Sequence, residues 1–293
     1  MTPLRLRVDV CTHRGFRDGV PEILRILRRR RARATFFVAI GPDSSGRAVF
    51  NLLKPSFARK MFRTNAAGSY GLATALYGTV LPAPMIGSGR PSLLRRILDE
   101  GHELGVHGWD HRRWQDDLDD YAPAKLASEF DRMCEACQAV TGSAPRAFAA
   151  PSWRVSRALL ELEARYGFAF ASDARGRHPF RPVFEGRPYS VPQVPVSLPT
   201  LDEALVEMDA PEFFRRTLAA VNGAAGFECL AVHAETEGRA YRREFADLLA
   251  KVDRPIGPLG ELALDDLPAE TMAMGSFRGR PFPICLQDGA PAA

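Results

Sequence analysis

The chain has 293 residues, of which 46% are hydrophobic and 25% charged, enough to build one large core. The net charge of +4 gives no support for nucleic-acid binding, and the chain carries no nucleic-acid motif. No apolar run approaches the ~18 residues that span a bilayer, and the amino terminus enters a predicted strand without a leader. We therefore expect a cytoplasmic protein in which residues 1–293 form a single domain.

The cysteines show no spacing typical of a disulfide framework, which agrees with a reducing compartment. They are Cys11, Cys134, Cys137, Cys229 and Cys285. Cys134 and Cys137 form a C-x-x-C motif, but Phe130, Met133 and Cys137 recur with helical spacing. The motif therefore predicts a buried helix face rather than a redox pair or a metal site.

Short β-rich runs alternate with helical stretches along the chain. Strands are predicted over 4–10, 34–40, 102–107, 146–151, 168–173, 189–196 and 228–233, and a helix over about 20–31 follows the first strand. This alternation predicts parallel strands with right-handed helical crossovers. About seven or eight such strands fit a complete or distorted (β/α) barrel better than an open sheet, and active residues are then expected at the carboxyl ends of strands.

Titratable residues follow several of these predicted strands. Asp9 and Cys11 end the first strand, His107 the third, Asp173 the fifth and His233 the seventh. The opposite strand ends carry Leu, Ala and Arg instead. The carboxyl-terminal rim is therefore the predicted active site.

The sequence HELGVHGWDH places His107 and His111 four residues apart. On a helical turn after a strand, this spacing puts both imidazoles on one side, where they can bind one metal ion. His102 lies near the strand entrance and is interpreted as structural. His13 shares the strand face of Asp9 and is a reserve ligand.

Several stretches closely resemble the ArnD-type deformylases, among them VDVCTHRGFRDGVPEIL, HELGVHGWDHRRWQ, SDARGRHPFRP and VHAETEG. These enzymes act on undecaprenyl-phosphate-linked 4-deoxy-4-formamido-arabinose and belong to the NodB-type polysaccharide deacetylases. The resemblance runs from about residue 4 to near Cys285. It implies a distorted (β/α) barrel with a long insertion after the second strand, a divalent metal held by Asp-His-His, and a role in lipid A modification and resistance to cationic peptides.

The resemblance also implies roles for individual residues. Asp9 matches the general base and His233 the general acid, while position 11 joins His107 and His111 in the metal triad. Metal polarisation of the formyl carbonyl, removal of a proton from water by Asp9 and protonation of the amine by His233 form a consistent mechanism.

Supporting roles follow from the same resemblance. Asp173 would orient His233. The family motif that usually supplies an arginine reads Ala-Ala-Pro over 149–151, so Arg154 is the predicted partner of Asp9. The predicted substrate contacts are Ser152, through its backbone N–H to the oxyanion, Trp153 and Glu235.

Cys11 stands where the family has an aspartate, and three interpretations stay open. In the first, its thiolate is a ligand, because Cys with two His is a known catalytic zinc set, and zinc is then the expected metal. In the second, the protein is a catalytically disabled homologue that binds the lipid-linked sugar. In the third, Cys11 is a nucleophile, which explains neither Asp9 nor His111.

The predicted insertion, residues 42–96, is rich in aromatic and basic side chains. They include Phe50, Phe57, Lys60, Phe62, Arg63 and Tyr77. Interfacial helices and helices that cap the barrel are both consistent with this composition. An anionic polyprenyl substrate implies a peripheral location at the inner-membrane surface. Residues 265–293 are expected to form a C-terminal tail.

Overall fold

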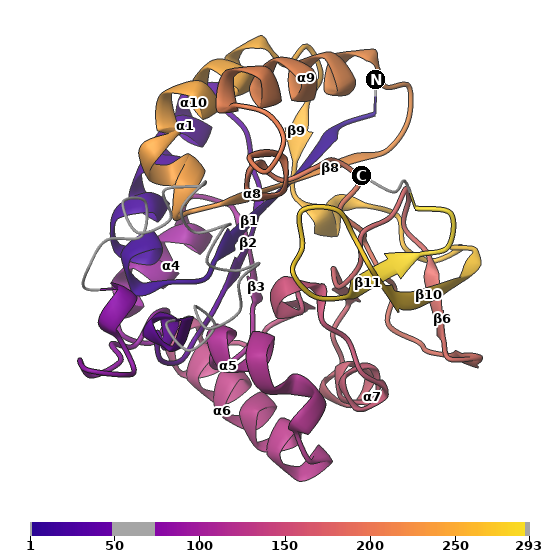
Figure 1. The fold of residues 1–293 in the computed structure, drawn as a ribbon. Coiled ribbons are helices and arrows are strands. Elements are labelled where there is room, and N and C mark those ends of the chain that lie inside the picture. The colour runs from indigo at the N-terminus through magenta and orange to yellow at the C-terminus, as the bar shows by residue number, and fades with distance from the viewer. Residues whose placement is uncertain (1, 49–73, 291–293) are drawn as a thin grey trace.

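Parallel strands form the centre of the molecule in the computed structural model, which describes residues 2–48 and 74–290 (Figure 1). The sheet has the order β5-β4-β3-β2-β1-β8, and β9 pairs with the start of β1. Its strands are β1 (Leu4–Val10), β2 (Thr35–Val38), β3 (Glu103–Val106), β4 (Ala147–Phe148), β5 (Phe170–Ala171), β8 (Glu228–His233) and β9 (Ile256–Gly257). All their ladders are parallel, so the predicted α/β fold is confirmed.

Helices surround this curled sheet, most of them along its outer face (Figure 1). They are α1 (Val20–Arg30), α4 (Pro91–Asp99), α5 (His111–Asp117), α6 (Pro123–Thr141), α7 (Arg157–Tyr166), α8 (Leu201–Ala204), α9 (Ala210–Gly223) and α10 (Arg242–Lys251). The predicted helix after the first strand is α1. In α6, Cys137 is buried in the core and Cys134 packs against it, as the helical spacing predicts.

Shorter helical turns connect these elements. Those with 3₁₀ geometry are η3 (Thr74–Leu76), η4 (Leu118–Asp120), η5 (Pro151–Trp153) and η7 (Leu259–Glu261). Two others, η1 (Gly15–Gly19) and η6 (Thr236–Ala240), are π-helical. Because η1 follows β1 and η6 follows β8, both π-turns lie at the carboxyl-terminal rim of the sheet.

The sheet separates two apolar cores. In β1, Leu4, Leu6 and Val8 pack into the larger core between sheet and helices. Alternate residues face the interior of the barrel, where Arg7 places its guanidinium 5.0 Å from the ring centre of Phe37. The strand is buried on both faces, as expected for parallel sheets.

The gap between β5 and β8 is closed by extended chain rather than by a regular strand. The predicted strand over 189–196 forms only isolated bridges, which are parallel from Ala171 to Gln193 and from Arg175 to Val196 and antiparallel from Phe180 to Gln193. Ser197 and Leu198 then donate backbone hydrogen bonds to the carbonyl of Cys229 in β8. A continuous strand is excluded because Pro192 and Pro195 lack backbone N–H donors, and the barrel is accordingly distorted.

A second sheet has the order β11-β10-β6-β7 and lies beside the barrel (Figure 1). It consists of β6 (Arg181–Phe184), β7 (Arg187–Pro188), β10 (Ala269–Gly275) and β11 (Ile284–Gln287). Two of these strands come from 265–293. That segment, expected as a tail, is thus built into a sheet, and its β11 exchanges backbone hydrogen bonds with Arg175.

Much of the predicted insertion lies outside the described residues, including Phe50, Phe57, Lys60, Phe62 and Arg63. Of its aromatic residues, Tyr77 is described, and its ring stands edge-on to His13 with ring centres 6.3 Å apart. Within residues 2–48 and 74–290, no helix is long and apolar enough to cross a membrane.

Candidate metal centre and catalytic site

Three side chains of types that can ligate a metal meet at the carboxyl ends of β1 and β3. One ligand atom from each of Cys11, His107 and His111 lies within 4.8 Å of the other two. His107 directly follows β3, and His111 is the first residue of α5. The carboxylate of Asp110 caps α5 by accepting a 3.0 Å hydrogen bond from the backbone N–H of Arg113. This cap fixes the turn that brings His111 back toward His107.

Both histidines are neutral in this setting. Burial lowers the pKa of His107 to about 4, and it lowers the pKa of His111 well below its usual value. Nδ1 of His107 lies 2.7 Å from the carbonyl oxygen of Ala149, which can only accept a hydrogen bond. Nδ1 therefore carries the proton, and Nε2 of His107 keeps a lone pair for a metal ion.

The backbone at Cys11 is held by Glu235. One carboxylate oxygen of Glu235 accepts hydrogen bonds from the backbone N–H groups of Cys11, at 2.8 Å, and Thr12, at 2.7 Å. Burial and the nearby carboxylates of Glu235 and Asp9 raise the pKa of the Cys11 thiol. A cation is thus needed to favour the thiolate at neutral pH.

The donor set fits a divalent metal ion. Two neutral imidazoles and one thiol are ligands that suit Zn²⁺, and three protein ligands leave coordination positions open, as catalytic zinc sites require. His13 is not part of this group. Its backbone N–H binds Asp43 at 2.8 Å.

Asp9 lies beside these donors and is paired with Arg7. Nε of Arg7 is 2.6 Å from Oδ1 of Asp9, and Nη2 is 2.8 Å from Oδ2. Burial alone would raise the pKa of Asp9, but the charge and hydrogen bonds of Arg7, together with the nearby His107 and His233, outweigh it, and the pKa falls to about 2. Oδ2 of Asp9 is 4.0 Å from Nε2 of His107. An ionised carboxylate thus borders the donor group.

His233, at the end of β8, is next to Asp202 of α8. Its Nδ1 lies 3.9 Å from Oδ1 of Asp202, and its backbone N–H donates to Glu237 at 3.0 Å. Burial disfavours the charged imidazole, yet the carboxylates of Asp202 and Asp9 raise the pKa of His233 above its usual value. His233 is therefore suited to carry a proton near neutral pH, in contrast to His107.

The prediction that Arg154 pairs with Asp9 is wrong. Arg154 donates to the backbone carbonyl of Gln115 and forms an ion pair with Asp119. Its guanidinium is directed to these partners by the η5 turn, whereas Arg7 already lies on the same strand face as Asp9.

The prediction that Asp173 orients His233 is also wrong. Asp173 accepts a hydrogen bond from the backbone N–H of Ala150 at 2.6 Å and another from Gln193 at 2.9 Å. Asp202 takes the place next to His233 instead. Because the neighbouring carbonyl oxygen of Ala149 lies 2.7 Å from Nδ1 of His107, Asp173 supports the position of His107 through the backbone.

The three predicted substrate contacts differ in exposure. Glu235 is buried and one of its carboxylate oxygens holds the Cys11 loop, and its role in binding substrate stays a prediction. Trp153 is only 2% exposed, and the guanidinium of Arg280 lies 4.6 Å from its ring centre, so in this structure its ring is not accessible to a substrate. Ser152 is half-buried in a left-handed conformation (φ 57°), and its role in the oxyanion site stays a prediction.

Sequence reasoning missed Arg7 and Asp202. The signal for Arg7 was its spacing of two from Asp9, which puts both side chains on one face of a strand. Asp202 has no such signal, because α8 reaches His233 only through the tertiary fold.

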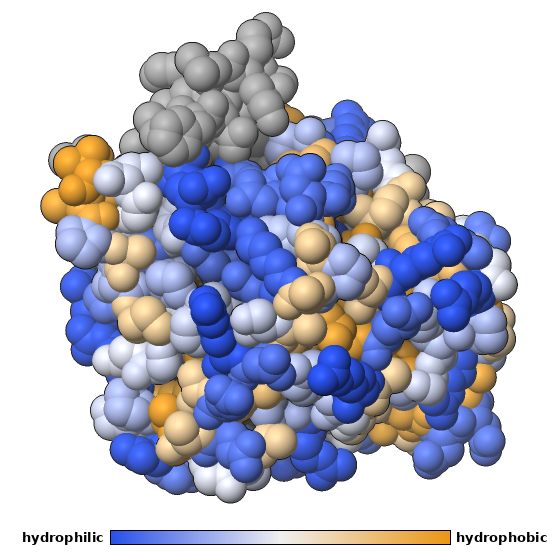
Figure 2. Space-filling view, turned by 90° about the horizontal axis from the view of Figure 1, so that it is seen from below, coloured by the Kyte–Doolittle hydropathy of each residue, from blue (hydrophilic) through white to orange (hydrophobic). Residues whose placement is uncertain are grey.

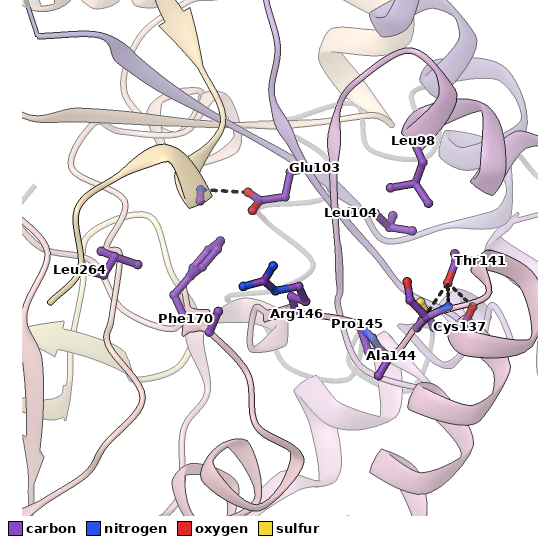
Figure 3. Close-up of a pocket in the computed structure, with 13 residues that line it drawn as sticks. Leu98, Glu103, Leu104, Cys137, Thr141, Ala144, Pro145, Arg146, Phe170 and Leu264 are labelled. Carbon is purple, nitrogen blue, oxygen red and sulfur yellow. Dashed lines mark hydrogen bonds between the residues drawn. The ribbon is translucent and has the colours of Figure 1, made fainter.

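A separate cavity of about 290 Å³ lies at the other end of the sheet. Figure 3 shows Glu103 and Arg146 in its wall together with Phe170 and Leu98. Glu103 begins β3, Arg146 precedes β4 and Phe170 begins β5, so these residues mark amino-terminal strand ends. The cavity is therefore distinct from the metal-ligating group.

Comparisons with known proteins agree with this geometry. The family model described as polysaccharide deacetylase matches residues 6–171. A protein of Shewanella sediminis, named probable 4-deoxy-4-formamido-L-arabinose-phosphoundecaprenol deformylase ArnD, is 38% identical over 85% of this chain and 81% of its own length. A protein of the same name from Wigglesworthia glossinidia brevipalpis is 31% identical over 80% of this chain and 82% of its own.

The fold has solved counterparts as well. The crystal structure of a polysaccharide deacetylase homologue from Mycobacterium smegmatis superimposes with a TM-score of 0.56 at 18% identity, covering 88% of this chain and 91% of that one. By its sequence, the chain belongs to the polysaccharide deacetylase family and, within it, to the ArnD-type amide hydrolases.

Proposed function

We propose that the protein hydrolyses the formamide of undecaprenyl-phosphate-linked 4-deoxy-4-formamido-arabinose and releases formate and the free amino-sugar lipid. The relatives named ArnD support the substrate. The observation that carries the proposal is the Cys11, His107 and His111 group, whose ligand atoms lie within 4.8 Å of one another, bordered by an ionised Asp9. In a bacterium with this pathway, the reaction would contribute to lipid A modification and resistance to cationic peptides.

Cys11, His107 and His111 would hold the divalent ion, with zinc favoured by the sulfur ligand. When bound, the ion supplies a Lewis acid that polarises the formyl carbonyl and makes water more acidic. Asp9 accepts a proton from the attacking water, whose oxygen forms a bond to the formyl carbon. Arg7 keeps Asp9 ionised and fixes the direction of its carboxylate.

His233 completes the reaction as the general acid. When the bond between the formyl carbon and the nitrogen breaks, the amine leaves with the proton that His233 donates. Asp202 stabilises the protonated imidazole before this step. The opposite pKa shifts of Asp9 and His233 thus separate the roles of base and acid.

The substrate also implies a location. A polyprenyl chain stays in the bilayer because each buried CH₂ contributes about 0.8 kcal/mol, so the protein must act at the inner-membrane surface. The exposed large apolar residues among those described are Leu76, Val80, Leu81 and Leu98, and three of them lie within 76–81. Figure 2 shows the face of the molecule seen from below, on which hydrophilic and hydrophobic residues are interspersed. Residues 76–81 are the described part of the proposed membrane contact.

One experiment tests the proposed reaction. The metal content of the purified protein is measured together with formate release from the formamido-sugar lipid. Bound metal and formate release, both lost on chelation and restored by zinc, are expected. A metal-free protein that binds the lipid without releasing formate would instead identify a disabled homologue, the alternative that Cys11 raises.

A further inference from the structure

The loop between β10 and β11 packs on α8, the short helix that carries Asp202. Gly279 in this loop has a left-handed backbone (φ 80°), and a Cβ at this position would lie 2.9 Å from the carbonyl oxygen of Glu203. This close approach of two backbone segments requires glycine. The backbone N–H of Arg280 then donates a 3.1 Å hydrogen bond to the carbonyl of Phe277, which closes the turn. The loop thus brings Arg280 to the start of α8.

The guanidinium of Arg280 contacts three side chains there. Its Nη1 lies 3.0 Å from Oδ2 of Asp202, its Nε donates to Glu203 at 2.9 Å, and its Nη2 donates to the hydroxyl of Thr200 at 3.2 Å. The side chain of Arg280 is only 8% exposed, so these contacts are largely shielded from solvent. A planar guanidinium can serve several acceptors at fixed directions. Arg280 therefore joins the hairpin of β10 and β11 to the turn that carries Asp202.

The carboxylate of Asp202 is held at both of its oxygens. Oδ2 faces Arg280, and Oδ1 accepts a 2.6 Å hydrogen bond from the hydroxyl of Thr200. Oδ1 is also the oxygen that lies 3.9 Å from Nδ1 of His233. Because rotation of the carboxylate would break one of these contacts, Arg280 and Thr200 together determine which oxygen faces the imidazole.

One buried ring lies beside the arginines of two ion pairs. The ring centre of Trp153 is 4.6 Å from the guanidinium of Arg280, which is paired with Asp202, and 5.5 Å from that of Arg7, which is paired with Asp9. A guanidinium near the face of an indole ring gains cation–π stabilisation, and the gain is larger where water is excluded. Trp153 thus supports the arginine on the acid side of the site as well as the arginine on the base side.

We propose that Arg280 is a positioning residue for the general acid, because it holds Asp202 in the orientation in which Asp202 faces His233. The inference rests on the proposed function, in which His233 donates a proton to the leaving amine. Asp202 favours the protonated imidazole only while its carboxylate stays close to Nδ1, since the attraction between two charges falls with distance. The hairpin of β10 and β11 therefore contributes to the active site through Arg280.

The first test is formate release by Arg280→Lys. The lysine keeps the positive charge beside Asp202 and Glu203, but its ammonium cannot reproduce the planar fork. We expect kcat to fall about tenfold or more, because part of the contribution of general acid catalysis is lost, and KM to stay within about twofold of the wild-type value. An unchanged kcat in the variant, with folding verified by circular dichroism, would overturn the proposal.

A double-mutant cycle with Asp202→Asn shows whether Arg280 acts through Asp202. Once Asp202 has lost its charge, Arg280→Lys should lower kcat little further, so the two effects should not be additive. A general structural effect would lower kcat by the same factor in both backgrounds, and that result would also overturn the proposal. If Arg280→Lys does not fold, Arg280→Gln takes its place in the cycle, since Glu203 keeps its ion pair with Arg175.

The control variant is Arg278→Lys. Arg278 lies in the same loop, and its guanidinium forms an ion pair with Glu207. The side chain of Arg278 is 66% exposed, and surface pairs of this kind contribute little to stability. Its kcat should equal that of the wild type. A fall as large as that in Arg280→Lys would show that any change in this loop disturbs the site, which contradicts a specific role for Arg280.

Failure of the proposed reaction can be told apart from failure of this inference. If the wild type releases no formate, the proposed function is wrong, and the four proteins of the cycle are compared by unfolding in urea. A shift of the urea midpoint by Arg280→Lys that is smaller in the Asp202→Asn background would still support Arg280 as the residue that holds Asp202. Equal shifts in both backgrounds would exclude it.

Discussion

Arg7 and Asp9 lie two residues apart on β1 and form a bidentate ion pair, with contacts of 2.6 and 2.8 Å. Both side chains are buried, so the pair depends on the geometry of the guanidinium fork rather than on charge alone. Arg7 also donates to the backbone carbonyl and hydroxyl of Ser172, which fixes the fork against the end of β5. One strand thus supplies both the proposed base and the cation that keeps it ionised.

Arg7→Lys should lower kcat by about tenfold or more, because an ammonium keeps the charge but cannot bind both carboxylate oxygens in one plane. Arg5→Lys is the matched control. Arg5 lies on the same strand face, but its guanidinium binds the backbone carbonyl of Pro258 at 2.8 Å. Formate release is measured for both variants, with circular dichroism to verify folding. Equal kcat values for the two folded variants would remove Arg7 from the mechanism.

Asp202→Asn should move the alkaline limb of the pH–kcat profile to lower pH. Burial disfavours the protonated form of His233, and the carboxylates, Asp202 foremost, raise its pKa above the usual value. Without Asp202 the pKa falls, and the general acid loses its proton at a lower pH. Asp209→Asn, which replaces one helix cap with another at α9, is the control. A limb that stays in place in Asp202→Asn would contradict the assignment of Asp202.

The residues at the strand ends could be found from the sequence. Asp9, Cys11, His107 and His233 all follow buried runs in a chain that alternates between strand and helix, and parallel strands bring such positions to one rim. His111 could also be found from the sequence, because its spacing of four residues from His107 places both imidazoles on one side of a helical turn. These inferences need only local periodicity and the rule that successive strands are parallel.

The partners of these residues could not be found in the same way. Asp173 and Asp202 both precede His233 in the chain, and no local sequence pattern shows which of the two carboxylates lies next to its imidazole. The tertiary structure of residues 192–198 decides this. Their prolines prevent a regular strand, and Gln193 in this segment donates a hydrogen bond to Asp173. Arg154 was a reasonable substitute for a missing arginine, but the η5 turn directs it toward Asp119.

Asp173→Ala should weaken metal binding about 10–100-fold although Asp173 is not among the proposed ligands. Asp173 fixes the backbone N–H of Ala150, and the preceding carbonyl of Ala149 orients His107. Loss of a supporting group of this kind typically reduces metal affinity by that factor. Affinity is measured by competition with a chelator. In the control Asp209→Ala, which removes a carboxylate far from the ligands, metal affinity should stay at the wild-type value.

Replacement of Leu76, Val80 and Leu81 by serine should reduce flotation of the protein with anionic liposomes. These side chains are 39%, 76% and 39% exposed, and each apolar group that enters the interface contributes to binding in proportion to its buried area. Leu98→Ser is the control, because Leu98 is similarly exposed, at 37%, but belongs to α4. If the triple variant and the control float equally well, residues 76–81 do not contact the membrane.

Cys11→Ser should bind metal far more weakly, whereas Cys11→Asp should bind it and accept manganese or cobalt as well as zinc, because a carboxylate is a harder ligand than a thiolate. The structure favours this outcome, since the Cys11 thiol lies with His107 and His111 in one group of ligand atoms. Metal content and formate release are measured for the three proteins, and Cys134→Ser, on the helix α6, is the control for loss of a thiol.

Activity of the wild type with zinc, lost in Cys11→Ser, fits a ligand. An inactive wild type with an active Cys11→Asp variant would show that the native site is disabled. Formate release by a metal-free wild type, with a formyl thioester that can be trapped, would identify Cys11 as a nucleophile and contradict both.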